Sequence, residues 1–278
     1  MVIAIIALLM SILLPSLQRI RKQARAVACQ ANLRQWGTLY ATYTAENDGY
    51  LPPREYNRRA YPTDPWWADW RWIGGTVGPG PTTDPATAAA NSASMSVVQD
   101  ILCCPMATRF VNPREYGSGR GGTFAARGWW EVPGEIWSSW KGSYGTPERA
   151  RSYWFDAVPE NRPFFWMTNV VKSAATAPVF LDCALPWADW TNEKAPPPDC
   201  DAVPTFVPNN NGPRSICINR HNGGINCLFL DWSVRKVELK ELWTLKWGEG
   251  YDTTGPWTKR GGARPEDWPE WMQGFKDY

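Results

Sequence analysis

The sequence predicts an α+β protein in which a long N-terminal helix packs on a small antiparallel sheet, with long loops rich in Trp, Gly and Pro. The helix is predicted by residues 17–47, which contain no Pro and only Gly37, and whose apolar residues recur every three or four positions. The sheet is predicted by short β-type runs near the C-terminus. The loops are predicted by an intervening stretch with little periodicity and many turn-forming residues.

The predicted helix begins at Val2, bends at Pro15 and ends at about Glu46. Its first part is apolar from Met1 to Leu14 except for Ser11. At about 1.5 Å per residue, this part covers only about two thirds of a membrane core about 30 Å thick. It is therefore too short to span a membrane as it stands. Arginines follow the apolar run instead of preceding it, so the run also fits a secretory signal peptide poorly.

Two faces of this helix differ in character when its residues are placed at about 100° per position. The first face is small and aliphatic and suits close contact with other helices: Ile20, Ala24, Val27 and Ala31. The opposite face is large and aromatic, and we assign helix-to-head packing to Cys29, Leu33, Trp36, Tyr40 and Tyr43. The segment AENDGYLPP then ends the helix with turn residues and two prolines. We expect a helix over residues 1–48 and a globular head over residues 49–278.

Four runs in the head have the composition of strands: residues 177–183, 214–220, 224–231 and 233–239. The turn at Asn222, Gly223 and Gly224 is expected to join the middle two as a hairpin, because these residue types tolerate positive φ. Residues 52–145 are predicted to be packed loops, in which aromatic side chains supply the burial: Trp66, Trp67, Trp70 and Trp72. Residues 243–278 are expected to wrap the surface as an ordered tail.

The composition excludes several classes of function. The net charge is only +2 and no basic stripe runs through the aromatic residues, so we expect no nucleic-acid binding. The seven cysteines show no CxxC spacing and there is a single His, which argues against a zinc knuckle and favours an oxidising compartment. The candidates for disulfides, with their pairing left open, are Cys103, Cys104, Cys183, Cys200, Cys217 and Cys227. Of these, Cys217 and Cys227 flank the predicted hairpin turn.

His221 is the only imidazole, so nucleophilic catalysis by Ser or Cys would have to use it. Its expected role is a hydrogen bond to the turn or to Asp231. We therefore predict no enzyme activity, no catalytic residue and no cofactor. A metal site is not predicted either, because His221 with Asp231 or Asp182 has no third ligand at a recognisable spacing.

The N-terminal sequence VIAIIALLMSILLPSL, followed by RIRKQARAVACQANLRQWGTLYATYTAENDGYLPP, resembles the N-terminal region of type IV pilin-like proteins. That family includes type IV pilins and type II secretion pseudopilins. The resemblance implies cleavage of a leader by a prepilin peptidase, and a mature chain beginning with a motif like FTLIELLVVIAIIALL. Only the second half of that motif is matched, so we expect about seven further residues upstream of Met1, which would bring the apolar segment to about 21 residues.

The resemblance implies a pilin-like fold and a structural role, namely a subunit of an extracellular type IV pilus-like filament. Its expected partners are copies of itself in a helical polymer, the inner membrane before assembly, prepilin peptidase and the pilus assembly machinery. The residues expected to form the assembly helix are Val2, Ile3, Ile5, Ile6, Leu8, Leu9, Ile12, Leu13, Leu14, Pro15 and Leu17.

A second resemblance lies in RHNGGINCLFLDWSV, which is similar to a C-terminal motif of a pilin-like subfamily in which His is followed after nine residues by Asp-Gly. His221 and Asp231 keep this spacing, but Trp232 stands where the subfamily has Gly. The segment GSYGTPERARSYWF, residues 142–155, resembles the SYG-containing segment of the same subfamily.

Two other functions remain open from the sequence. The first is a pseudopilin of a type II secretion system, which would share the helix and the fold class. The second is a surface-anchored glycan-binding protein, in which exposed tryptophans of the loops stack on polysaccharide.

Overall fold

A computed structural model describes residues 2–51, 101–111, 125–128, 141–147, 166, 168–184, 187–188, 194–200 and 212–278 of the chain. The predicted loop residues Trp66, Trp67, Trp70 and Trp72 lie outside these described residues. So does most of the 142–155 segment after Pro147.

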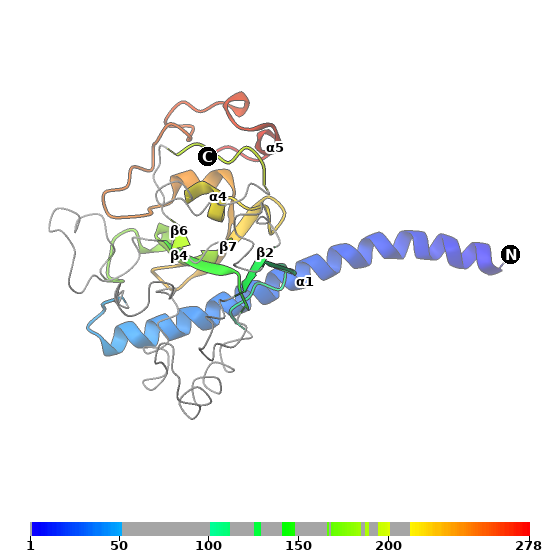
Figure 1. The fold of residues 1–278 in the computed structure, drawn as a ribbon, viewed down its shortest axis with the longest axis horizontal. Helices are drawn as coiled ribbons and strands as arrows, with labels where there is room; N and C mark the ends of the chain where they lie inside the picture. Colours follow the sequence, from blue (N-terminus) through cyan, green and yellow to red (C-terminus); the bar gives the residue numbers. More distant parts are fainter. Residues whose placement is uncertain are drawn as a thin grey trace, which may run out of the picture.

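The N-terminal helix α1 is continuous over Val2–Glu46 and passes through Pro15. It ends in a turn, in which the backbone N–H groups of Asn47 and Gly49 donate to the Thr44 carbonyl. Positive φ angles at Asp48 and Gly49 reverse the chain there. Figure 1 shows α1 as a long rod whose C-terminal half crosses the head and whose N-terminal half projects away from it. The predicted extent of the helix is therefore confirmed, and the bend at Pro15 stays a prediction.

The main sheet has the strand order β6-β4-β5-β7-β8, in which β4, β5, β7 and β8 pair antiparallel and β6 pairs parallel with β4. These strands are β4 (Tyr144–Pro147), β5 (Pro178–Asp182), β6 (Trp187–Ala188), β7 (Gly224–Phe229) and β8 (Val234–Glu238). A smaller sheet joins β1 (Arg109–Val111), β2 (Ala125–Gly128) and β3 (Lys141–Gly142). These strands correct the prediction of loops over residues 52–145, because pairing between separate segments forms strands that local periodicity does not reveal. Together with α1, the antiparallel strands confirm the α+β class.

The remaining described helices are short: η4 (Ala174–Thr176), α4 (Gly212–Ile216), η5 (Lys240–Thr244), η6 (Pro265–Asp267) and α5 (Glu270–Gln273). The α4 helix corrects one predicted strand, since residues 214–220 were expected to be extended. Pro213 favours a helical start because its φ is already restricted and it has no N–H to leave unpaired. The Cys217 N–H then donates to the Pro213 carbonyl at 2.7 Å, which closes one helical turn.

The predicted hairpin is also corrected, because its first strand does not form. Asn222 and Gly223 do have positive φ, so the turn exists, but it connects the segment after α4 to β7. The hairpin in the structure joins β7 to β8, and its connection contains Trp232 at φ 63°.

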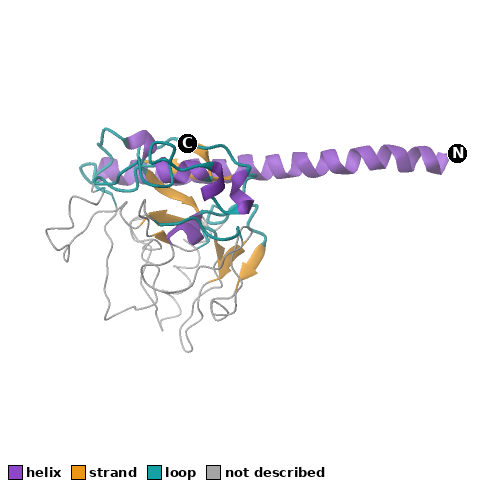
Figure 2. Cartoon of the chain, turned by 90° about the horizontal axis from the view of Figure 1, so that it is seen from above, coloured by secondary structure: helices purple, strands orange, loops and turns teal. Residues whose placement is uncertain are grey.

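The sheet is covered on both faces (Figures 1 and 2). On one face, Leu33, Trp36 and Tyr40 of α1 pack with Phe180 and Leu228. On the other, the chain after β8 contributes buried residues to a second core, with Ile225, Cys227 and Phe229 of β7 pointing into it: Leu242, Trp243, Leu245, Trp247, Trp268 and Met272. The C-terminal segment is thus ordered, as expected, but it contributes buried residues to the second core instead of only wrapping the surface.

A buried lysine anchors this C-terminal segment. Lys240 has a fully buried side chain whose Nζ lies 2.6 Å from the Asp277 carboxylate. The same ammonium group sits over the Trp268 ring. An ion pair and a cation–π contact therefore connect the end of β8 to the last residues of the chain.

Candidate functional site

The first candidate site is the projecting half of α1, which we call the stem and define as residues 2–24. Large apolar side chains are exposed all around it: Val2, Ile3, Ile5, Ile6, Leu9, Met10, Ile12, Leu13, Leu14, Leu17 and Ile20. The described members of the predicted assembly helix thus lie on a free surface. In the described part of the chain, none of the helices combines the length and the apolar character needed to cross a membrane.

The second half of α1 lies against the sheet, and we call it the docked half, residues 29–44. Cys29, Leu33, Trp36 and Tyr40 are buried there, and Tyr43 is half-buried. The other predicted face, with Ile20, Ala24, Val27 and Ala31, is exposed. Trp36 contacts the Phe180 ring at 4.9 Å between centroids, and its Nε1 donates to the Ile101 carbonyl at 2.8 Å.

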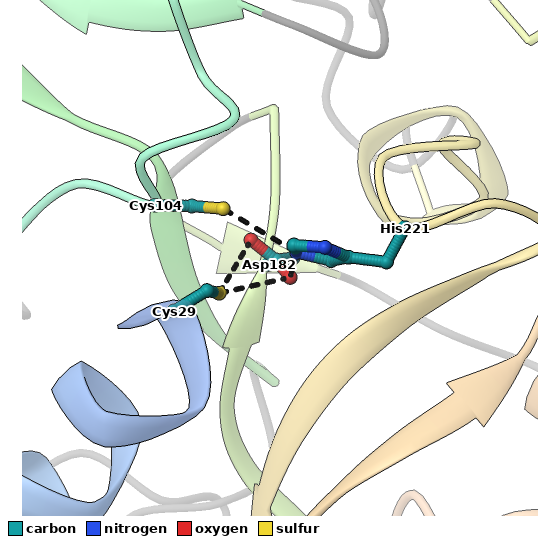
Figure 3. A group of neighbouring side chains, drawn as sticks. All are labelled: Cys29, Cys104, Asp182 and His221. Carbon is teal, nitrogen blue, oxygen red and sulfur yellow. Dashed lines mark hydrogen bonds and ion pairs between the residues drawn. The ribbon is translucent and has the colours of Figure 1, made fainter. Parts of the chain in front are cut away.

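The second candidate site is a buried polar cluster where the docked half begins, formed by Cys29, Cys104, Asp182 and His221 (Figure 3). Each residue comes from a different part of the fold. Cys29 is on α1, Cys104 is in the turn before β1, Asp182 ends β5, and His221 precedes β7. One ligand-type atom from each lies within 4.8 Å of all the others. Residues far apart in the sequence are thus brought to a single point.

Asp182 is the centre of this cluster, and its side chain is fully buried. One carboxylate oxygen accepts from Arg220 at 2.9 Å. The other lies 2.9 Å from Nε2 of His221 and accepts from the backbone N–H of Asn226 at 2.9 Å. The Cys29 thiol donates weakly to both oxygens, at 3.6 and 3.7 Å. Burying a carboxylate costs free energy unless it is paired, and these partners provide that compensation.

Neighbouring groups hold the two sulfur atoms in position. Cys104 Sγ lies 3.3 Å from Nε2 of His221. The Tyr144 hydroxyl donates to Cys29 Sγ at 3.2 Å. Ser143 accepts from the Cys104 N–H through its hydroxyl and from Arg220 through its carbonyl, both at 2.7 Å. The SYG segment singled out in the sequence therefore supports the cluster from β3 and β4.

The charges of the cluster depend on each other. Burial raises the pKa of Asp182, but His221 and Arg220 outweigh it and hold that pKa well below its usual range. Burial lowers the pKa of His221, but Asp182 and Cys104 raise it to about 9. Burial raises the pKa of Cys104, while bonds from Cys29 and His221 and the Arg220 charge lower it to about 7. Burial raises the pKa of Cys29 well above its ordinary value.

A Cys, a His and an Asp in contact also occur in nucleophilic enzymes, but the geometry here differs. In such a triad the carboxylate binds one ring nitrogen of His and the nucleophile binds the other. Here Asp182 and Cys104 both approach Nε2. Nδ1 of His221 is buried and has no hydrogen-bond partner among the described residues. The four side chains thus direct their ligand-type atoms to one point, and no path for proton transfer runs from Asp182 through the His221 ring to Cys104.

The structure corrects the expected partner of His221. Its carboxylate partner is Asp182, whereas Asp231 is exposed and accepts from the backbone N–H and the hydroxyl of Ser233. The expected side-chain partner Asp231 is therefore wrong, and Asp182 entered the sequence analysis only as a possible metal ligand beside His221. Trp232, which stands where the subfamily motif has Gly, adopts the positive φ that a glycine would favour. Its ring stacks on Tyr40 of α1 with centroids 6.1 Å apart.

All seven cysteines are thiols in the structure, and the disulfide candidates stay predictions. Cys217 and Cys227 do not flank a hairpin, because the expected first strand is replaced by α4. Cys217 Sγ instead lies 3.9 Å from Met272 Sδ.

Sequence reasoning had assigned the members of the cluster to separate roles. Cys29 is assigned to packing, Cys104 to a disulfide and Asp182 only to a possible metal site with His221, while Arg220 has no role. Local spacing could not join them, since Cys29 and Asp182 are 153 positions apart. The one signal in the sequence was that Ser143 and Tyr144 belonged to a motif-like segment without an assigned role.

Comparisons of the chain with protein-family models, with curated proteins and with solved structures give no match.

Proposed function

We propose that this protein is a structural subunit of an extracellular type IV pilus-like filament and polymerises through the stem. The observation that carries the proposal is the exposure of the stem's apolar side chains beside a well-packed docked half. Ile3, for example, is 84% exposed, whereas Leu33 on the same helix is completely buried. Soluble monomers rarely keep so much contiguous apolar surface free, so another molecule is expected to cover it.

The stem suits two environments in turn. Its large aliphatic residues, such as Ile6, Leu9 and Leu13, are equally compatible with lipid and with the side chains of other helices. The proposal is that the inner membrane holds this surface before assembly and that stems of other copies hold it afterwards. The same apolar burial stabilises both states, so transfer between them requires little net free energy.

The exposed face with Ala24, Val27 and Ala31 continues the stem surface toward the head. Small residues allow helix backbones to approach closely, which supports a bundle of stems as the filament core. In such a bundle one surface of a subunit contacts a different surface of the next. Contacts of this kind do not close on themselves and produce a helical polymer.

The pilin-like fold is part of the proposal. A long helix whose C-terminal half is packed on an antiparallel sheet, and whose N-terminal half is free, suits a subunit that must present one helix to many neighbours. A type II secretion pseudopilin would use the same arrangement in a short periplasmic polymer. The length of the filament at the cell surface distinguishes the two.

The described tryptophans give the glycan-binding alternative no support. Trp36, Trp166, Trp243, Trp247 and Trp268 are buried. Trp232, Trp257 and Trp271 are half-buried and pack against the two cores. In these positions they fill the two cores and hold loops by hydrogen bonds, as Trp243 does to the Lys194 carbonyl.

A charge-insertion experiment tests the filament proposal. The double variant Ile6→Asp and Leu9→Asp places two carboxylates on the stem, and Gln35→Asp places one on an exposed position of the docked half. We expect surface filaments, seen by electron microscopy with an antibody to the head, to be lost only in the double variant. Near-UV circular dichroism should show the same folded head in the wild type, the double variant and Gln35→Asp.

Filaments that persist in the double variant would refute assembly through the stem. Cells that carry the wild-type chain on their surface without any filament would refute the structural role itself.

A further inference from the structure

We propose that Cys29, Cys104, Asp182 and His221 bind one divalent transition-metal ion, with Zn²⁺ as the ion that these donors suit best. No metal site is predicted from the sequence, because His221 and Asp182 have no third ligand at a recognisable spacing, so the proposal rests on the three-dimensional arrangement. It does not depend on filament formation, because the site is inside the head.

Three of the six distances between the ligand atoms can be compared with those around a tetrahedral zinc ion, and all six are within 4.8 Å. With zinc–sulfur bonds of about 2.3 Å and zinc–nitrogen or zinc–oxygen bonds of about 2.0–2.1 Å, the edges of the tetrahedron are about 3.3–3.8 Å. The observed separations are 3.3 Å between Cys104 Sγ and His221 Nε2, and 3.6 Å between Cys29 Sγ and Asp182 Oδ2. The His221–Asp182 contact of 2.9 Å needs to widen by a few tenths of an ångström.

The kinds of donor favour zinc over other common ions. Two thiolates exclude a site for Mg²⁺ or Ca²⁺, which prefer oxygen ligands. Two sulfurs, one imidazole and one carboxylate form a mixed tetrahedral set of the type zinc accepts. The four ligands come from four separate parts of the chain, so no single loop would define the geometry of the site.

The charges of the buried site would also balance with a dication bound. Two thiolates and the Asp182 carboxylate would carry three negative charges. A divalent ion and the buried Arg220 guanidinium, which lies 2.9 Å from Asp182, would carry three positive charges. A buried site of zero net charge avoids the large cost of an uncompensated ion in the protein interior.

The surroundings provide the outer contacts that metal ligands require. Arg220 holds the other oxygen of Asp182, and the Tyr144 hydroxyl donates to the Cys29 sulfur. Such outer partners orient the ligands and tune the ion. The imidazole of His221 makes its described polar contacts through Nε2, the nitrogen that faces the other ligand atoms, while Nδ1 has no outer partner among the described residues.

A bound ion would connect α1 to the head at the start of the docked half. Cys29 is the most N-terminal buried residue of α1 in the described chain, and the other three ligands belong to the head. Binding of the ion to the folded state alone would stabilise this attachment.

The test uses the full chain, reduced, loaded with Zn²⁺ and freed of excess metal. Native mass spectrometry should show one zinc ion per chain. Replacement by Co²⁺ should give the visible bands of a tetrahedral site and a thiolate-to-cobalt charge-transfer band.

Cys29→Ser and Cys104→Ser should lose both the bound zinc and the cobalt bands, whereas Cys103→Ser, a change at the adjacent cysteine, should retain them. Tyr144→Phe should weaken zinc binding by about 10- to 100-fold, as expected for an outer contact.

A second measurement keeps the test valid if a ligand variant folds poorly. Removing zinc from the wild-type chain and from Cys103→Ser with a chelator should lower the melting temperature of both, and returning Zn²⁺ should restore it.

Three results would overturn the proposal. The reduced wild-type chain could retain no zinc. Alternatively, the variants Cys29→Ser and Cys104→Ser could retain as much zinc as the wild type, which would indicate that zinc binds elsewhere. The wild-type chain could also contain a Cys29–Cys104 disulfide, detected as a linked peptide, and bind no zinc after reduction.

Discussion

The stem and the docked half are parts of one helix, yet their side chains have opposite environments. In the stem, Ile12 is 67% exposed, and in the docked half Trp36 is 1% exposed. The stem exposes apolar side chains on all sides as far as Leu17, while the docked half buries one face and exposes Arg34, Gln35 and Thr38 on the other. Backbone hydrogen bonds hold the helix together in both halves. Only the docked half therefore adds to the stability of the head, and the stem is free to serve another contact.

The largest expected effect is a loss of free energy of unfolding that occurs in the docked half and not in the stem. Trp36→Ala removes a ring that packs on Phe180 and a hydrogen bond to the Ile101 carbonyl. We expect it to lower the free energy of unfolding by about 3–5 kcal/mol, the usual range for a buried aromatic residue changed to Ala. The matched change in the stem, Ile12→Ala, should stay within about 0.5 kcal/mol. Denaturant unfolding followed by near-UV circular dichroism measures both, and equal losses would contradict the division of the helix.

The second prediction concerns the buried cluster at the border between the halves. Asp182→Asn leaves the buried Arg220 guanidinium without its carboxylate, which typically costs about 3–5 kcal/mol. The measurement is urea unfolding in the presence of a chelator, so that the ion pair alone is tested. Asp231→Asn is the control, because Asp231 is exposed and contacts only Ser233 among the described contacts. A greater loss for Asp231→Asn would mean that His221 and Arg220 rely on the other carboxylate.

A third prediction tests how closely the docked half approaches the sheet. Gly37 is buried, and a Cβ atom there would lie 2.9 Å from a Leu228 methyl of β7. Gly37→Val should therefore force the helix and sheet apart and cost about 1–3 kcal/mol. Thermal melts of the wild type, Gly37→Ala and Gly37→Val should give a graded series. A Val variant as stable as the wild type would show that this contact is loose.

The smallest effect is expected where the β7–β8 connection meets the docked half. Trp232 combines an unfavourable positive φ with a stacking contact on Tyr40. Trp232→Ala loses the ring and keeps the strain, while Trp232→Gly loses the ring and relieves the strain. The Gly variant should thus be more stable than the Ala variant by about 1 kcal/mol. Identical melting temperatures for the two variants would argue against strain at this residue.

Much of the fold could be predicted because its signals are local. The full extent of α1 follows from the spacing of residues such as Leu33, Trp36 and Tyr40, and its end follows from Asn47 and Gly49. The strands β5, β7 and β8 follow from short runs of β-branched and aromatic residues bounded by turns. The predicted strand at 214–220 failed because Pro213 starts a helical turn that short-range strand propensity does not detect.

The cluster could not be predicted in the same way. Its members are distant in the sequence, and each has an ordinary local explanation: Cys29 as a small packing residue, Cys104 as a disulfide candidate, Asp182 as the end of a strand. The spacing of His221 and Asp231 predicted that these two side chains are partners. In the structure β7 lies between them, so Asp231 is far along the strand from His221, in an exposed turn.

The amino-acid sequence alone determined the long helix, the change from an apolar stem to an amphipathic docked half, and the α+β class, because periodicity and turn chemistry act over a few residues. Only the tertiary structure decided that Asp182 is the partner of His221 and that two cysteines face them. It also decided that the C-terminal segment contributes side chains to the second core. These outcomes depend on which surfaces meet when the sheet is covered on both faces, and contacts between distant segments leave no regular spacing in the chain.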